Sequence, residues 1–440
     1  MRRAMDPSAA PCRQSRFPAD GGAGDACRPV RTVRVSRALR AALVTLFLGV
    51  ALPLGVALAV PSAGATDLSV GFIGDLTGVG ANVAQDQLDG FRLGLKHLAG
   101  RLGGNEVNLI VAEGGHDPRV ARLSVERMVQ AERVQVILLS VDAPSMPAML
   151  PPAIAARSVT IALSPPPVAL AARDCSAWFF SLSGLAETGH DLTGQYLQQH
   201  GFHTVVVAGP DTAAAKAAVA AVQRGFRGQV SVVTSRRGEM NFERDLKSVR
   251  AAHPDAVYLL HTGGMAVNFI RQMASFFGKD HPALFGPATT LDQSVLAASG
   301  TPAADAWSLA PWSDDVDQPV SRRVMTDFEA DYGRPASLAA IIGYDGAMLL
   351  DAAVRIADKR FNEPDALKSA LRKAEFPSPR GTVRFDTNQF PIQSYLARQA
   401  GVDSRGRIIN EQRGVFLKDV RDGHAGECPL RWQPEPPPKG

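Results

Sequence analysis

The sequence predicts an α/β protein made of two lobes of parallel sheet with a cleft between them. Short apolar runs alternate with helical patterns along the chain, which is typical of parallel sheets covered on both faces. After Cys175 the pattern starts again and gives a second half of similar size. With 440 residues and 45% hydrophobic content, the chain is long and apolar enough to bury two such cores.

The first half follows a regular strand–helix order. Its expected strands are residues 68–74, 106–114, 134–140 and 158–164, and its helices 84–100, 116–130 and one after 140. In the second helix, Asp117 suits the N-cap and Pro118 the first helical position. Three prolines follow the last strand. Because proline has no backbone N–H, this strand should stop at Ser164.

The second half repeats this order after an extended segment at 177–183. Its expected strands are residues 203–209, 228–237 and 255–261, and its helices 187–201, 212–226, 242–253 and 265–278. Two long helices follow at 319–333 and 337–357, then β-like segments at 381–390 and 393–401 and a Pro-rich tail at 431–440. Ligands of open α/β sheets bind outside the C-terminal strand ends, here 74–80, 140–145, 164–168, 209–214 and 261–264.

Residues 1–65 have the order of a secretory leader. Four arginines at 31–40 precede an apolar run at 41–60, and Ala63-Gly64-Ala65 fits a cleavage site that would leave Thr66 as the first mature residue. An uncleaved membrane anchor is the alternative, because the apolar run is long enough to span a bilayer. Pro53 and the small-residue site favour cleavage and a periplasmic location.

Charge and cysteine usage separate the leader from the body. Residues 1–65 contain nine Arg and three Asp and carry a net charge of +6, which leaves −2 for the remainder of a chain that totals +4. The body therefore offers no basic surface for nucleic acid. Cys175 and Cys428 remain after cleavage and would meet an oxidising compartment, where they form a disulfide or persist as two separate thiols.

Motifs for catalysis and cofactors are weak or missing. Gly78 and Gly80 follow a strand like a dinucleotide loop, but Val83 stands where the last glycine belongs. The nine His residues show no metal-ligand spacing, and no G-x-S-x-G, P-loop or H-E-x-x-H motif occurs. We expect no cofactor, no metal and no enzymatic activity.

An ordered set of segments from 67 to 428 resembles the Leu/Ile/Val-type periplasmic binding proteins of ABC transporters. The segments are VGFIGDLTG, HDPRVA, DCSAWFF, QRGFRG, RAAHPDAVYLL, GGMAVNFIRQ, ADYGRPASLAAIIGYDGAMLLDAAV and RGTVRFDTNQFPIQSY. The resemblance implies a type I periplasmic-binding fold, whose two lobes are joined by three crossovers and close on a small solute. It also implies a membrane permease as partner and a monomeric protein, and a branch with similar DCS and EC segments supports pairing Cys175 with Cys428.

In that fold the crossovers would lie near 181–184, 307–311 and 393–396. Lobe one would comprise 66–183 plus 309–392, and lobe two 184–308 plus 393–430. The resemblance places the candidate ligand-binding residues at strand ends and in the hinge: Thr77, Gly78, Val83, Asp142, Ala143, Ser164, Ser183, Thr212, Ala214, Gly263 and Thr289.

Several of these positions depart from the family's grip on an amino acid. Val83 and Ala214 replace aromatic rings, and Asp142 with Ala143 replaces a Ser-Ser pair. The prolines after Ser164 remove N–H donors, and a carboxylate at Asp142 would repel a ligand carboxylate. We therefore hypothesise a cationic, polar neutral or bulkier ligand instead of ordinary branched-chain amino acids. Alternatively, Asp142 caps the following helix and never meets the ligand.

The sequence favours an exported solute-binding protein of an ABC importer. A periplasmic sensing module or a degenerate binding module without a transport role is the second interpretation, and an exported enzyme is the third.

Overall fold

The computed structural model describes residues 68–78, 80–114 and 117–430. The signal peptide, its cleavage after Ala65 and the Pro-rich tail 431–440 lie outside these residues and stay predictions. Within the described ranges, no helix has the length and apolar character needed to cross a membrane.

The first sheet has the strand order β2-β3-β1-β4-β5-β6. Its strands are β1 (Leu68–Gly74), β2 (Arg101–Leu102), β3 (Asn105–Glu113), β4 (Val136–Ser140), β5 (Val159–Ala162) and β6 (Phe179–Ser181). All neighbours pair in parallel except β2, which forms an antiparallel pair with β3. β5 ends at Ala162, two residues before the end expected from the prolines.

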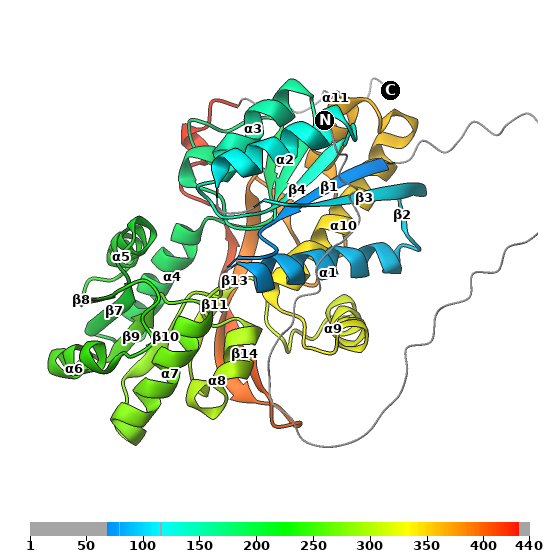
Figure 1. The fold of residues 1–440 in the computed structure, drawn as a ribbon. Helices are drawn as coiled ribbons and strands as arrows, with labels where there is room; N and C mark the ends of the chain where they lie inside the picture. Colours follow the sequence, from blue (N-terminus) through cyan, green and yellow to red (C-terminus); the bar gives the residue numbers. More distant parts are fainter. Residues whose placement is uncertain (1–67, 79, 115–116, 431–440) are drawn as a thin grey trace, which may run out of the picture. The chain divides into compact units, whose positions relative to one another are not determined.

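Helices cover both faces of this sheet (Figure 1). They are α1 (Ala81–His97), α2 (Pro118–Gln130), α3 (Met146–Ala155), α9 (Pro319–Tyr332), α10 (Leu338–Ala357) and α11 (Pro364–Lys373). Along β4, Val136 and Leu138 pack into the core under α1 and α10, whereas Ile137 and Leu139 pack into the core under α2 and α3. Both faces are thus buried, as the continuous apolar run of β4 predicts.

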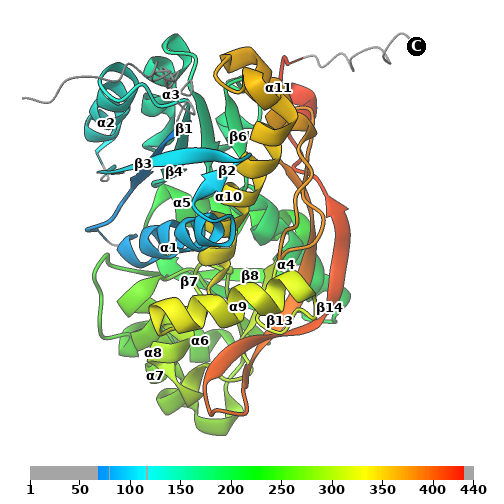
Figure 2. The same cartoon turned by 90° about the vertical axis from the view of Figure 1, so that its right-hand side faces the viewer.

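Two glycines let α1 and α10 approach closely (Figure 2). A Cβ on Gly90 would lie 1.9 Å from the carbonyl oxygen of Ala340, and a Cβ on Gly343 would lie 2.0 Å from that of Gln87. Any larger residue at these two positions would push the helices apart. The contact fixes the ends of α1 and α10 that carry Gln87 and Leu338.

The second sheet is mixed and follows the order β12-β13-β11-β10-β9-β7-β8, with β14 on β13. Its strands are β7 (Thr204–Pro210), β8 (Gln229–Ser235), β9 (Ala256–Leu259), β10 (Ala283–Phe285), β11 (Trp307–Ala310), β12 (Arg384–Phe385), β13 (Pro391–Val402) and β14 (Ile408–Val420). Its helices are α4 (Ala186–Gln199), α5 (Ala213–Gly225), α6 (Glu243–Ala252), α7 (Gly263–Phe277) and α8 (Gln293–Ser299). β13 pairs antiparallel with β11, β12 and β14, so the second sheet is parallel from β11 to β8 and antiparallel around β13.

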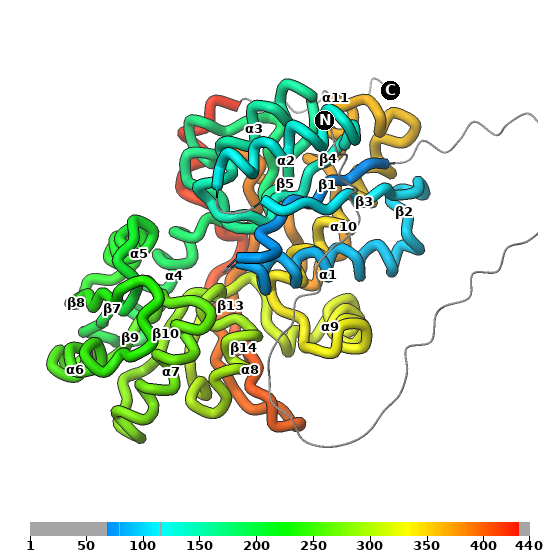
Figure 3. Tube along the Cα trace, in the orientation of Figure 1, coloured from blue at the N-terminus to red at the C-terminus, as the bar shows by residue number. Residues whose placement is uncertain are grey.

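The chain passes between the two sheets after β6, after β11 and at the start of β13, and these passages can be followed in Figure 3. Leu309 and Ala310 were expected in lobe one, but they pair with β13 in the second sheet. The second passage therefore begins at Pro311. Asp117 caps α2 as predicted, since its side chain accepts a hydrogen bond from the Arg119 N–H, and Pro118 occupies the first turn.

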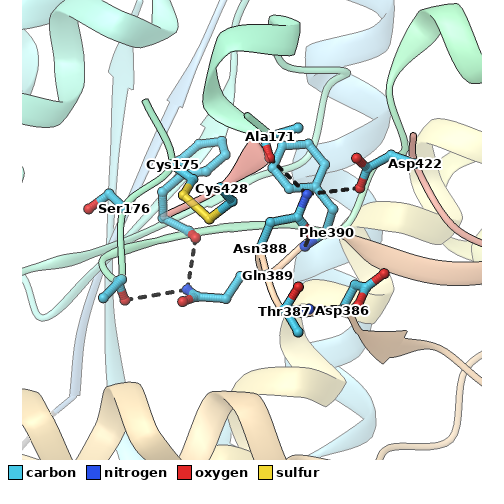
Figure 4. Close-up of a disulfide and its surroundings, with 12 residues drawn as sticks. Ala171, Cys175, Ser176, Asp386, Thr387, Asn388, Gln389, Phe390, Asp422 and Cys428 are labelled. Carbon is cyan, nitrogen blue, oxygen red and sulfur yellow. Dashed lines mark hydrogen bonds between the residues drawn. A yellow bond between two sulfur atoms is a disulfide. The ribbon is translucent and has the colours of Figure 1, made fainter. Parts of the chain in front are cut away.

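The segment after β14 returns to the first lobe and is fastened at several points. Asp422 accepts a hydrogen bond from Asn388, and Cys428 forms a disulfide with Cys175, with 5.8 Å between the two Cα atoms (Figure 4). His424 contacts Glu187 on α4, which packs on the second sheet. The segment 421–428 is therefore a fourth link between the lobes, and we call it the strap.

Replacing Cys175 and Cys428 together by serine should lower the free energy of unfolding by roughly 2–5 kcal/mol, because the disulfide closes a long loop in the unfolded chain. Differential scanning calorimetry of the oxidised protein and the variant measures this loss. Dithiothreitol should shift the wild-type melting temperature toward that of the variant and leave the variant unchanged. Equal melting temperatures for oxidised wild type and variant would contradict the assignment.

His424 makes the strap sensitive to pH. Its Nε2 lies 2.6 Å from Glu187 Oε1, and its Nδ1 lies 2.8 Å from Glu427 Oε1. Burial lowers the pKa of His424, but hydrogen bonds and charge from the two glutamates outweigh burial and raise the pKa above its ordinary value. The stabilisation is therefore complete below about pH 6.5 and is lost as the pH rises through the raised value.

A His424→Gln substitution should consequently destabilise the protein more at pH 6 than at pH 8.5. Urea unfolding at both values measures the difference. The matched control is His281→Gln, because His281 is exposed and contacts only the neighbouring carbonyl of Pro282. A His424→Gln effect that is equal at both pH values would rule out the charged contact.

Candidate ligand-binding site

A cavity of about 150 Å³ is lined by both lobes and by the hinge segments between them. Lobe one contributes Val83, Gln87, Leu163, Ser164, Pro165, Leu338, Ala339 and Ile342. Lobe two contributes Leu185, Ala186, Gly189, His190, Pro287, Ala288, Thr289, Asp292 and Leu309. Ser183, Gly184, Pro311, Gln393 and Tyr395 line it from the hinge, and Arg380 lines it from the end of lobe one, where it contacts the hinge residue Gln393.

The cavity wall is mainly apolar and offers few donors. Valine, leucine and isoleucine side chains from α1, α10 and β11 form much of it. Pro165, Pro287 and Pro311 contribute no backbone N–H groups. Such a lining suits the apolar body of a small organic molecule.

Polar groups at the lobe-one side are largely occupied by one another. The Gln87 amide and the Ser183 hydroxyl both donate to the carbonyl oxygen of Leu163, at 2.8 and 2.6 Å. The Ser164 hydroxyl donates to Gln87 Oε1 at 3.4 Å. Each hydroxyl has only one hydrogen to donate, so neither serine has a spare donor for a ligand.

A buried ion pair lies at the hinge side of the cavity. Arg380 Nε donates to Asp345 Oδ2 at 2.6 Å, and both side chains are 0% exposed. Arg380 Nη1 donates to the Leu182 carbonyl at 3.0 Å and to Gln393 Oε1 at 2.8 Å. Burial raises the pKa of Asp345, whereas the charge and hydrogen bond of Arg380 and the hydrogen bond of Ser378 oppose that shift.

His190 presents a neutral imidazole to the cavity from α4. Its Nδ1 lies 2.6 Å from the Tyr258 hydroxyl. Burial lowers the pKa of His190 to about 4, against an opposing effect of Glu187. Thr193 donates its only hydroxyl hydrogen to the Gly189 carbonyl. In its hydrogen bond with Tyr258, Thr193 must therefore be the acceptor and Tyr258 the donor. Because the Tyr258 hydrogen is used in this way, its oxygen accepts from His190 Nδ1–H. This order leaves His190 Nε2 as an acceptor.

Asp292 supplies a carboxylate from the loop before α8. Its Oδ1 caps the helix by accepting from the Val295 N–H at 3.0 Å and also accepts from the Ser294 hydroxyl at 2.7 Å. Burial raises the pKa of Asp292, hydrogen bonds from these neighbours lower it, and the charge of Asp86 raises it. Oδ2 makes no hydrogen bond to a described residue.

A family model described as "Periplasmic binding protein" matches residues 67–406. The chain belongs to this family. Periplasmic binding proteins capture solutes and are not enzymes, and the two-lobe fold predicted from the sequence is confirmed. The narrower Leu/Ile/Val-type assignment stays a prediction. No curated protein matches the chain.

Solved structures of low identity share this periplasmic binding protein fold. A solute-binding protein of an ABC transporter from R. palustris, in complex with benzoate, is 24% identical, with a TM-score of 0.74 over 82% of this chain and 99% of that chain. A substrate-binding protein from Sphaerobacter thermophilus is 24% identical, with a TM-score of 0.75 over 80% and 99%. A leucine-binding protein from Thermotoga maritima is 16% identical, with a TM-score of 0.69 over 80% and 99%.

The structure places four of the eleven residues expected at the ligand in the cavity wall, namely Val83, Ser164, Ser183 and Thr289. The others are absent from that wall: Thr77, Gly78, Asp142, Ala143, Thr212, Ala214 and Gly263. Thr212 caps α5 by accepting from the Ala215 N–H. Asp142 lies in the loop between β4 and α3, and its ligand contact stays a prediction.

Sequence reasoning missed His190, Asp292, Gln87 and Arg380 as cavity residues. His190 and Gln87 lie in helical patterns whose polar positions read as solvated faces. The sequence indicates only part of the role of Asp292. Asp followed by Gln-Ser-Val is a helix N-cap pattern, and Asp292 is indeed the N-cap of α8. Nothing in the spacing of Arg380 connects it to Asp345, 35 residues earlier.

A buried Ser-His-Asp cluster in lobe two does not support the enzyme interpretation. Ser235 donates to Asp245 at 2.5 Å, and His261 Nε2 lies 3.1 Å from the same hydroxyl. In a nucleophilic triad the carboxylate holds the imidazole, but here it holds the serine. All three residues are at most 2% exposed. The cluster is a structural network of the lobe interior.

Asp345→Asn should destabilise the protein by about 3–5 kcal/mol, because it leaves the buried Arg380 charge unpaired. Urea unfolding with linear extrapolation measures the loss. Arg384→Ala is the control, since Arg384 and Asp419 form an exposed pair that should be worth at most about 1 kcal/mol. Similar small losses for both variants would show that the ion pair does not hold the hinge.

Proposed function

We propose that this periplasmic binding protein is the exported receptor of an ABC importer and delivers a small organic solute to a membrane permease. The observation that carries the proposal is the apolar cavity whose wall is shared by both lobes and the hinge. A solute that contacts both lobes favours the closed arrangement, which a permease would then recognise. The leader with its site after Ala65 and the ABC-transporter neighbours support export and transport.

The bound R. palustris neighbour holds benzoate, whereas the Thermotoga neighbour is named for leucine. Apolar groups of that size fit a wall of leucine, valine, isoleucine and proline side chains. We propose the same coarse class here, a small organic solute with an apolar body. The protein should act as a monomer, because the cavity is complete within one chain.

Native mass spectrometry of the exported protein, purified without denaturant, tests this function. A small molecule that is retained in the native spectrum and released on unfolding would identify the solute. Adding that solute back should raise the melting temperature and reduce the radius of gyration in solution scattering, because closure compacts the two lobes. A proven ligand that leaves the scattering curve unchanged would contradict hinge closure.

A substitution in the cavity wall tests whether the solute binds in this cavity or at another site. Val83→Trp should weaken binding of the retained solute by at least about tenfold, because the ring fills part of the cavity. Val120→Trp is the control on α2, where the native side chain is 43% exposed and lies outside the cavity wall. Isothermal titration calorimetry compares the two variants. Equal affinities would place the solute elsewhere.

A further inference from the structure

The cavity wall contains the carboxylate of Asp292, which forms no ion pair with a described residue. Two of its lining residues, Arg380 and Asp292, can carry a charge at neutral pH, and His190 is neutral because burial lowers its pKa to about 4. Arg380 is sealed against Asp345 with its side chain 0% exposed, so that pair contributes no net charge. No described residue forms an ion pair with Asp292. The remaining charge of the wall is therefore that of the Asp292 carboxylate.

Two acceptor atoms in lobe two lack partners in the described part of the chain. They are Asp292 Oδ2 and His190 Nε2. Neither is among the fully buried unpartnered atoms, so both keep surface that a solute can reach. Polar groups in a largely apolar cavity fix the orientation of a ligand by hydrogen bonds. A ligand that matches this pair must bring donors.

An anionic ligand finds few side-chain donors in the wall, and Arg380 Nη2, which lacks a partner in the described part of the chain, is fully buried. The hydroxyl hydrogens of Ser164 and Ser183 are used within the wall, and three prolines contribute no N–H. A ligand carboxylate near an ionised Asp292 would meet a like charge, which is unfavourable. An ammonium would instead relieve the cost of burying that carboxylate.

We propose that the cavity takes an organic ammonium compound with an apolar body, whose ammonium pairs with Asp292 and which gives a further hydrogen bond to His190 Nε2. This inference rests on the proposed solute-binding function and names the class of solute for that same cavity. The charge of Arg398 interacts with Asp292 from behind the wall, without an ion pair between the two side chains. Arg398 is absent from the wall and donates to Ser308 and to the Trp312 carbonyl.

Matched probes test the charge preference by isothermal titration calorimetry on the purified exported protein. The aliphatic set is the amine 3-methylbutylamine, the acid 4-methylpentanoate and the amino acid leucine. The aromatic set is the amine 2-phenylethylamine, the acid 3-phenylpropionate and the amino acid phenylalanine. Within each set the amine should bind at least about tenfold more tightly than the acid. A set in which the acid binds more tightly than the amine would overturn the ammonium assignment and leave the solute-binding function intact. No binding of any probe, together with an empty native spectrum, would overturn both.

Two substitutions test the roles of Asp292 and His190 in amine binding. Asp292→Asn keeps an amide oxygen that can cap α8 but removes the charge, and it should weaken amine binding by at least about tenfold. His190→Phe should weaken it by a smaller factor. Asp117→Asn is the control, since it makes the same exchange at the exposed N-cap of α2 outside the wall. Amine affinity that is the same in Asp292→Asn and in the control would overturn the role of Asp292.

Discussion

The arrangement of the hinge depends on the buried pair of Arg380 and Asp345. One guanidinium holds the carboxylate of α10, the Leu182 carbonyl of the first passage and Gln393 of the third. A charge buried without a partner is costly, so this arrangement is favourable only while all these groups stay together. The hinge is therefore anchored to lobe one through α10.

The same anchoring shapes the cavity. α10 is held by Arg380 at its middle and by α1 at Gly90 and Gly343, where the two helix backbones meet without side chains between them. Gln87 and Leu338, which line the cavity, lie beside these contacts. The lobe-one wall is thus rigid and apolar, with its polar groups already satisfied. Selectivity has to come from groups that face it from lobe two.

The sequence predicts the fold well because local signals and long-range packing agree. Buried strands such as β4 are continuous apolar runs, and Asp117-Pro118 marks the start of α2 as expected. The antiparallel edge at β13 and β14 was missed, since alternating polar residues there do not reveal their partner strand. The cavity was harder to predict. Residues such as Asp142 and Thr212 follow strand ends in the sequence, but only the tertiary fold determines which of them reach the wall.

The cavity has an apolar wall in lobe one and a wall with hydrogen-bond acceptors in lobe two. This division suggests how closure of the lobes would depend on the solute. In the open arrangement an apolar body gains most from lobe one, where burial of apolar surface is the favourable term. Asp292 and His190 belong to lobe two, so a solute held against lobe one would reach them only where the two lobes lie close together. A purely apolar molecule would occupy the first wall without recruiting the second. Under the proposed function, closure would then respond to the donor groups of the solute, and a permease could recognise the specific cargo from the closed form.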